Sequence, residues 1–180
     1  MSKKILVICT SFRKKSNSET LADAFIKGAR ESGNSVEKVT LKDKRIAFCK
    51  GCLACQKQQK CMIADDAVEI VQKMHDAEAI VFATPIYYYE MSGQMKTLLD
   101  RANPLYPSNY AFRDIYLLTA AAEEESYVPE KAISGLNGWI DCFENASFAG
   151  SVFAGGVNEI GEIEGHGALS EAYELGKSIS

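Results

Sequence analysis

Short apolar runs alternate along the chain with segments whose apolar residues recur every three or four positions. The apolar runs lie at residues 5–9, 79–83, 115–122 and 148–154, and Val36, Val39 and Leu41 mark a further, shorter strand. Continuous apolar runs of this length are typical of strands that are buried on both faces of a parallel sheet. The pattern therefore predicts five strands.

The segments between the runs show helical periodicity. We expect the first helix to be capped by Ser18, with Leu21 and Phe25 on its inner face and Gly33 at its end. Acidic residues at 65 and 66 favour the start of the next helix. Further helices are expected from Ser92, from Pro129 to about Asn145, and over Ala168–Ile179.

Strands that alternate with helices predict right-handed crossovers and a parallel sheet covered on both faces. We therefore expect one α/β domain over residues 1–180, a flavodoxin-like three-layer sandwich. Its five-stranded parallel sheet would have the order 2-1-3-4-5, with helices on both faces. Ligands of such folds bind at the carboxyl ends of the strands, beside the switch point. The loops after Cys9, Thr84 and Leu118 would meet there.

Composition narrows the classes of function. The formal net charge is −4, from 20 Lys and Arg against 24 Asp and Glu, and this argues against nucleic acid as a partner. The apolar run Ile5–Cys9 is too short for a signal peptide, and no stretch approaches the length of a membrane span. We expect a soluble cytoplasmic protein without membrane association, whose six cysteines are thiols or ligands.

The loop after the first strand, residues 10–18, has the composition of an anion site. Hydroxyls, an amide and free backbone N–H groups precede a helix, and Arg13 adds a planar charge that pairs with phosphate. The alternative is a solvated basic turn. The loop lacks the glycines of an ATP-binding P-loop or of a Rossmann dinucleotide site.

This loop resembles the Gly-Ser-Pro-Arg-Lys-x-Gly-Asn-Ser/Thr phosphate loop of the NADPH-dependent FMN reductase family. The matching residues are Ser11, Arg13, Lys14, Asn17 and Ser18. Three family residues are replaced, by Thr10, Phe12 and Ser16. The resemblance implies that the matching residues bind the phosphate of FMN.

The loop after the third strand begins with Pro85 and continues with three successive tyrosines. Such a loop is typical of a platform for a flat ring, and a tyrosine-rich dimer interface is the alternative. The segment is similar to the family's Ser/Thr-Pro-Val/Ile-Tyr turn and its following helix. The resemblance implies a flavin ring held by Pro85, Ile86, Tyr87, Tyr88 and Ser92, with Thr119 and Ala120 on its other side.

Four cysteines form the sharpest local motif, Cys49-x-x-Cys52-x-x-Cys55 followed by Cys61. This spacing suits the ligands of a [4Fe–4S] cluster better than those of a structural zinc site. It is similar to that of the iron–sulfur flavoproteins. Free thiols and a disulfide remain alternatives, since FMN reductase relatives without a cluster look similar here. Cys9 and Cys142 are expected in the core.

The resemblance implies an enzyme, an FMN-dependent NAD(P)H oxidoreductase. Hydride would pass from NADH or NADPH to FMN, and electrons would then reach an unidentified acceptor, directly or through a [4Fe–4S] cluster. No catalytic side chain is expected, because the flavin carries the chemistry. The family also implies a homodimer or homotetramer. The alternatives are a flavodoxin-type electron carrier, which does not itself oxidise NAD(P)H, and a thiol redox sensor.

Overall fold

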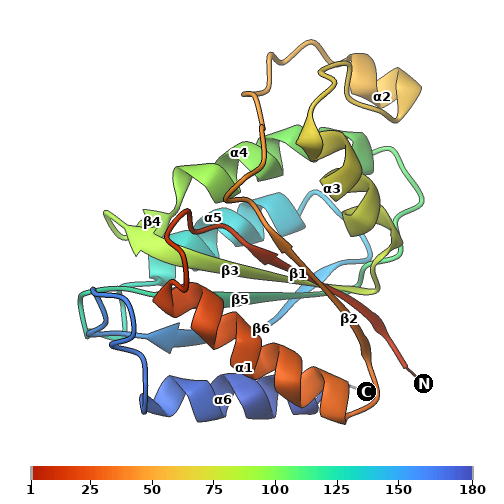
Figure 1. The fold of residues 1–180 in the computed structure, drawn as a ribbon. Helices are drawn as coiled ribbons and strands as arrows, with labels where there is room; N and C mark the ends of the chain where they lie inside the picture. Colours follow the sequence, from red (N-terminus) through yellow and green to blue (C-terminus); the bar gives the residue numbers. More distant parts are fainter. Residues whose placement is uncertain (1, 180) are drawn as a thin grey trace.

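The computed structural model describes residues 2–179 and places five parallel strands in one sheet. The spatial order is β2-β1-β3-β5-β6, which confirms the predicted order of the parallel strands (Figure 1). Their bounds are β1 Lys4–Cys9, β2 Ser35–Thr40, β3 Ala79–Tyr87, β5 Asp114–Ala120 and β6 Ser147–Ala154. A short strand, β4 Glu90–Met91, pairs antiparallel with the end of β3.

Helices cover both faces of the sheet. Helices α1 Asn17–Glu31 and α6 Gly167–Lys177 lie on one face, and α3 Asp66–Asp76, α4 Gly93–Arg101 and α5 Glu130–Ile140 lie on the other (Figure 1). Alternate residues of β1 belong to different cores, with Ile5 and Val7 under α1 and α6 and Leu6 and Ile8 on the opposite face. Because both faces of β1 are covered, all of its residues from Ile5 to Cys9 are apolar.

Two glycines let α1 and α6 touch backbone to backbone. A Cβ atom on Gly28 would lie 2.0 Å from the carbonyl oxygen of Tyr173, and one on Gly176 would lie 2.1 Å from that of Phe25. No larger side chain fits at either position unless the helices separate. Helix α6 therefore supports α1 along its length, and the N-terminus of α1 faces the carboxyl edge of the sheet.

Some predicted boundaries were wrong. Ser16, not Ser18, caps α1, and its hydroxyl accepts a hydrogen bond from the backbone N–H of Glu19 at 3.2 Å. The predicted core position of Cys142 is also wrong, because α5 ends at Ile140 and the thiol that follows is exposed. Cys9 is buried as predicted, and this burial raises the pKa of its thiol to about 12.

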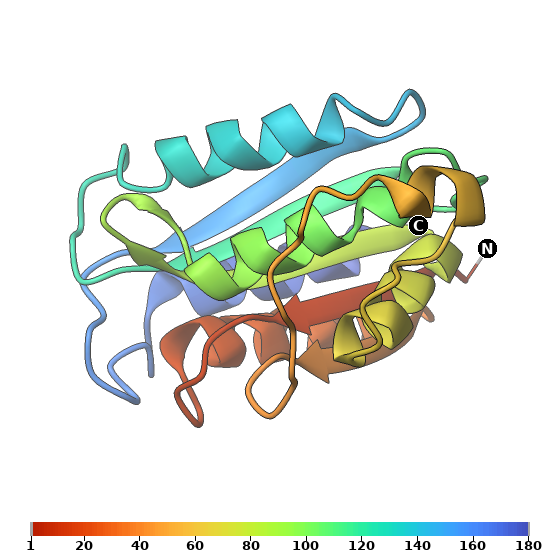
Figure 2. The ribbon, with the colours of Figure 1, turned by 90° about the horizontal axis from the view of Figure 1, so that it is seen from above.

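A long segment between β2 and α3 rises away from the sandwich and contains the five-residue helix α2 Ala54–Gln58 (Figures 1 and 2). We call residues 48–62 the cysteine loop. A 3-10 turn, η1 Asn103–Leu105, follows α4 and packs against α2. Among the described residues no helix has the length and apolarity needed to cross a membrane.

Arg101, the last residue of α4, holds both ends of the cysteine loop. Its side chain is fully buried, and Nη1 and Nη2 donate to the two carboxylate oxygens of Asp65 at 2.6 and 2.8 Å. Nη1 also donates to the carbonyl of Ala47 at 2.8 Å, and Nη2 to that of Ile63 at 3.1 Å. One guanidinium therefore fixes the residue before the loop and the residue after it.

Asp65 is the N-cap of α3 as well as the partner of Arg101. Its carboxylate accepts hydrogen bonds from the backbone N–H groups of Ala47 at 2.8 Å and Ala67 at 3.1 Å. Burial alone raises the pKa of Asp65, but the hydrogen bonds from Arg101 and these N–H groups outweigh burial and hold the pKa below its usual value. The carboxylate is therefore charged at neutral pH.

We expect Asp65→Asn to lower the free energy of unfolding by about 3–5 kcal/mol, because it leaves the buried guanidinium of Arg101 without its counter-charge. The lowered pKa of Asp65 adds a pH dependence. The contribution of the Asp65 carboxylate to the free energy of unfolding is complete above pH ~4, the ordinary pKa of an aspartate. It is lost as the pH falls through the lowered pKa that Asp65 has in the folded protein. Urea unfolding at several pH values measures both effects.

Asp100→Asn is a matched control on the same helix. Asp100 pairs with Lys96 at 2.6 Å, but the two side chains are 49% and 60% exposed, so the loss should stay below about 1 kcal/mol. Equal losses for the two variants would contradict the role given to the Arg101–Asp65 pair.

Candidate functional site

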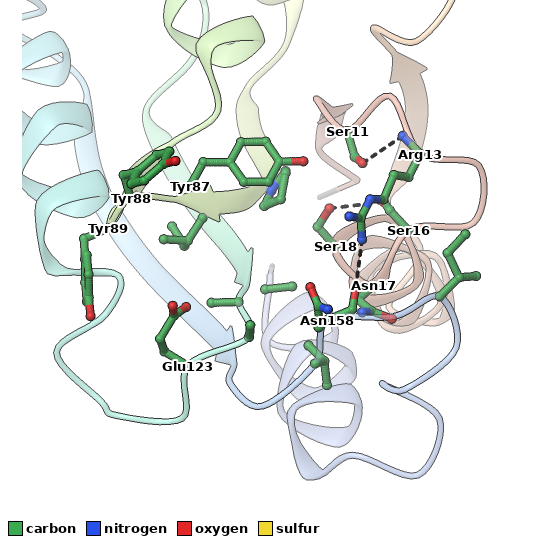
Figure 3. A pocket seen from close by; sticks show the side chains of 17 residues that line it. Ser11, Arg13, Ser16, Asn17, Ser18, Tyr87, Tyr88, Tyr89, Glu123 and Asn158 are labelled. Carbon is green, nitrogen blue, oxygen red and sulfur yellow. Dashed lines mark hydrogen bonds between the residues drawn. The ribbon is translucent and has the colours of Figure 1, made fainter.

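A pocket of about 360 Å³ opens at the carboxyl edge of the sheet. Its walls are the loop between β1 and α1, the β3–β4 hairpin, and the loops that follow β5 and β6 (Figure 3). The predicted site residues that line it are Ser11, Arg13, Asn17, Ser18, Pro85, Ile86, Tyr87, Tyr88 and Ala120. The loops that topology was expected to bring together therefore do meet.

One end of the pocket is formed by the first turn of α1. Ser16, Asn17 and Ser18 are buried there, and the two serine hydroxyl oxygens are 3.3 Å apart. The backbone N–H of Arg13 donates to the hydroxyl of Ser11 at 3.2 Å, which folds the loop into a turn. Hydroxyls and the positive end of a 15-residue helix make this end of the pocket suited to an anion. We call Ser11, Arg13 and residues 16–18 the anion cradle.

The cradle is tied to the loop after β6. Nη1 of Arg13 donates to the carbonyl of Asn158 at 2.8 Å (Figure 3). Nδ2 of Asn17 donates to the carbonyl of Glu159 at 2.9 Å. These contacts hold the guanidinium of Arg13 at the edge of the pocket. The guanidinium keeps further N–H groups with which it can bind an anion.

The opposite wall is a tight hairpin of tyrosines. Tyr87 pairs with Glu90, and the two residues between them, Tyr88 and Tyr89, have φ values of 52° and 65°. Two-residue hairpins with positive φ at both positions normally use Asn-Gly or similar pairs. A left-handed conformation costs a bulky residue roughly 1–2 kcal/mol. Strain of this kind is concentrated at functional sites.

The hairpin presents its aromatic rings to solvent and to the pocket. Tyr88 is fully exposed and Tyr87 is 45% exposed. The ring of Tyr89 stacks on Tyr127 with the centroids 6.2 Å apart, and the ammonium group of Lys131 lies 5.7 Å from the centre of the Tyr89 ring. Figure 3 shows the ring of Tyr87 extending toward the anion cradle, whereas the ring of Tyr89 lies on the side of the hairpin that is remote from the cradle.

Three predicted site residues, Lys14, Ser92 and Thr119, lie outside the lining of this pocket. Ser92 is buried beneath it, with its hydroxyl oxygen 2.9 Å from that of Thr10 and 3.1 Å from that of Thr84. Thr119 is buried and donates to the carbonyl of Val152 at 3.4 Å. Ser92 and Thr119 are therefore placed to support the walls from behind.

Sequence reasoning missed part of the lining. The missed residues are Ser16, Tyr89, Ala122, Glu123, Val157, Asn158 and Ile160. Most of them lie in the loops that follow β5 and β6, which have no recognisable motif. The available signal was topological, because the loop after the last strand must also open at the carboxyl edge of a parallel sheet.

A second cavity, of about 490 Å³, lies at the other end of α4. All four cysteines of the loop line it, and Cys142 after α5 is a fifth thiol on the same wall. The six cysteines of the chain are free thiols. Within residues 2–179, no three acidic, histidine or cysteine side chains are arranged closely enough to hold a metal ion.

The cavity offers sulfur ligands and N–H donors that face them. Nδ2 of Asn103 donates to the sulfur of Cys55 at 3.0 Å, and the backbone N–H of Gly51 donates to that of Cys49 at 3.4 Å. Positive φ values at Gly51, Leu53 and Gln59 turn the loop tightly around the cavity. The donor set suits a thiolate-bound cluster, which the loop would close around.

The chain is similar in sequence to iron–sulfur flavoproteins. The chain is 33% identical over 138 residues to an iron–sulfur flavoprotein of Methanosarcina thermophila, covering 76% of the chain and 72% of that protein. It is 37% identical over 101 residues to an iron–sulfur flavoprotein of Archaeoglobus fulgidus, covering 56% of the chain. That match spans only 46%, less than half, of the Archaeoglobus protein.

Solved structures show the same fold. An NAD(P)H:quinone oxidoreductase from Methanothermobacter marburgensis has a TM-score of 0.74 at 17% identity, with 98% of this chain and 96% of that chain covered. An FMN-dependent NADH-azoreductase from Bacillus anthracis, in complex with FMN, has a TM-score of 0.68 at 16% identity, with 96% and 97% covered. The family model for NADPH-dependent FMN reductase matches residues 3–126, and the chain belongs to that family.

Proposed function

We propose that the chain binds FMN in the pocket at the carboxyl edge and uses it to oxidise NADH or NADPH. The observation that carries the proposal is one pocket with an anion cradle on one wall and a strained tyrosine hairpin on the other. FMN has the matching chemistry, a phosphate dianion at one end and a flat aromatic ring at the other. Membership in the FMN reductase family supports the assignment.

The phosphate would bind in the anion cradle. Ser11, Arg13 and residues 16–18 would supply hydroxyl, guanidinium and backbone N–H donors, and the dipole of α1 favours the negative charge. The ring would lie between the hairpin residues 85–88 and the loop at residues 120–123. The alanines of that loop leave room for a second planar group beside the ring.

When bound, FMN supplies the chemistry: it accepts a hydride, two electrons and one proton, from the reduced nicotinamide, which leaves as NAD(P)⁺, and gives the electrons to an acceptor. The chain's own part is to hold the ring and the nicotinamide together and to face the ring with backbone N–H groups of the Tyr87–Tyr88 turn. These dipoles favour the negative charge of the reduced ring. No acid or base side chain is required.

We further propose that Cys49, Cys52, Cys55 and Cys61 bind a [4Fe–4S] cluster. Such a cluster transfers single electrons, which would couple the flavin to one-electron acceptors. The two cavities lie at opposite ends of α4, a helix of nine residues. At 1.5 Å per residue this is about 14 Å. A homodimer or homotetramer would provide a second route between the two sites. A cluster needs its four cysteines as reduced thiols rather than as disulfides, and we therefore propose that the protein is located in the reducing cytoplasm.

A second candidate function, a thiol redox sensor, is favoured by one observation. Five free thiols, including the exposed Cys142, line a single cavity. Reversible oxidation of such thiols to a disulfide is a common basis for redox sensing. The experiments below separate this function from cluster binding.

Arg13→Ala should raise the Kd for FMN by about 10- to 100-fold, because it removes charged hydrogen bonds to the phosphate. The Kd for riboflavin, which has no phosphate, should change less than about threefold. Titration of flavin fluorescence measures both constants. Lys14→Ala removes the same charge from the next residue, which does not line the pocket, and should leave both constants within about twofold. An equal loss for FMN and riboflavin would contradict the phosphate role of Arg13.

NADH or NADPH should bleach the visible flavin bands of the FMN-loaded protein under anaerobic conditions, without a second enzyme. Free FMN at the same concentration is the control and should bleach far more slowly. If dithionite bleaches the bands but neither nicotinamide does, the chain is an electron carrier rather than an NAD(P)H oxidoreductase.

Anaerobic incubation with Fe²⁺ and sulfide should produce a broad absorption shoulder beside the flavin bands. Cys52→Ala should lose it, because a cubane cluster needs four ligands, and Cys142→Ala should keep it. The iron content of the purified protein is the second measurement. A reversible disulfide among these thiols, with no bound iron in the wild type, would instead support the redox sensor.

A further inference from the structure

Two nitrogen donors from the end of α4 and the turn after it lie beside the sulfurs of the cysteine loop. The side-chain amide of Asn103 donates to the sulfur of Cys55 at 3.0 Å. Among the described residues this amide makes no other hydrogen bond. Asn103 lies two residues after Arg101, and both line the cysteine cavity. Neither residue contributes to the lining of the flavin pocket.

Arg101 has one N–H group left over. A guanidinium carries five N–H donors. The four on Nη1 and Nη2 are matched by two oxygens of Asp65 and by the carbonyls of Ala47 and Ile63. The fifth, on Nε, is buried and has no partner among the described residues. A buried N–H without a partner loses its hydrogen bond to water and gains none in return, so this position suits an additional acceptor.

The sulfur of Cys61 is the acceptor that the surroundings offer. Cys61 and Arg101 line the same cysteine cavity and also the neighbouring cavity beside α3. The carboxylate of Asp65 neutralises the guanidinium, so Arg101 acts on the sulfur through a directed N–H group more than through net charge.

We propose that Asn103 and Arg101 are positioning residues for the cysteine sulfurs and raise the reduction potential of the cluster that the loop binds. Asn103 donates to Cys55 in the structure, and Nε of Arg101, which has no partner there among the described residues, would donate to Cys61 once the loop closes around the cluster. The inference rests on the proposed [4Fe–4S] function of the loop. Hydrogen bonds to ligand sulfurs stabilise the more negative, reduced cluster, so each donor favours uptake of an electron.

The test is a redox titration of the reconstituted protein, followed by visible absorption and electron paramagnetic resonance. Asn103→Leu keeps the size of the side chain and removes the donor. At the wild-type midpoint potential, its ratio of reduced to oxidised cluster should fall by about tenfold, which is 59 mV for a one-electron couple. Asn103→Gln keeps an amide and should recover part of the shift.

Gln59→Leu is the matched control. Gln59 is also in the cysteine loop, but its amide donates to the carbonyl of Pro107 at 3.1 Å rather than to a sulfur. The midpoint potential of this variant should equal that of the wild type. Arg101→Lys keeps the charge and removes the Nε–H, and it should also lower the midpoint. Arg101 also fixes the ends of the loop, so its substitution can change the loop structure as well as the hydrogen bond to sulfur. The Asn103 variant is therefore the decisive one.

The outcomes separate this inference from the proposed function. An intact cluster in Asn103→Leu with the wild-type midpoint would overturn the inference and leave the cluster in place. An equal shift in Gln59→Leu would also overturn it, because the effect would then not depend on a sulfur contact. A wild-type protein that assembles no cluster would overturn the cluster proposal itself, and the inference with it.

Discussion

The architecture of the cysteine region depends on the buried ion pair between Arg101 and Asp65. Asp65 caps α3, Arg101 ends α4, and the same guanidinium holds Ala47 and Ile63. Three segments that are distant in sequence, at residues 47, 63–65 and 101, are thereby joined at one point. The ends of the cysteine loop are fixed, while most residues between them, apart from the buried Cys55, are exposed. Such a loop can close around a bound group without moving the rest of the fold. An unpaired buried charge is energetically costly, so the requirement to pair Arg101 with Asp65 strongly favours this one arrangement of the segments.

Helix α4 relates this region to the pocket at the sheet edge. At its start, Ser92 links Thr10 and Thr84, the residues from which two walls of the pocket continue. At its end, Arg101 and the following Asn103 lie beside the sulfurs. A single short helix therefore sets both the shape of one site and its separation from the other. The two sites share no lining residue, so each can be altered by substitution with little direct effect on the other.

Much of the fold followed from the apolar runs, because strands buried on both faces leave a clear signal, and their alternation with helices left few topologies. The β3–β4 hairpin was not predicted because Tyr88-Tyr89 lacks the turn residues that identify such hairpins. The cap of α1 was placed two residues late, since Ser16 and Ser18 suit the role equally by composition. The loop after β6 lines the pocket through backbone and mixed side chains, for which no sequence pattern exists.

The left-handed tyrosines at the hairpin tip have a consequence for engineering. Selection for thermal stability alone would favour Asn-Gly at residues 88 and 89, since that pair adopts the same turn without strain. Such a change would also delete the ring that stacks on Tyr127 and the most exposed aromatic side chain beside the pocket. Libraries designed for higher stability should therefore keep these two residues constant, because substitutions there would alter the surface at which we propose that the ligand binds.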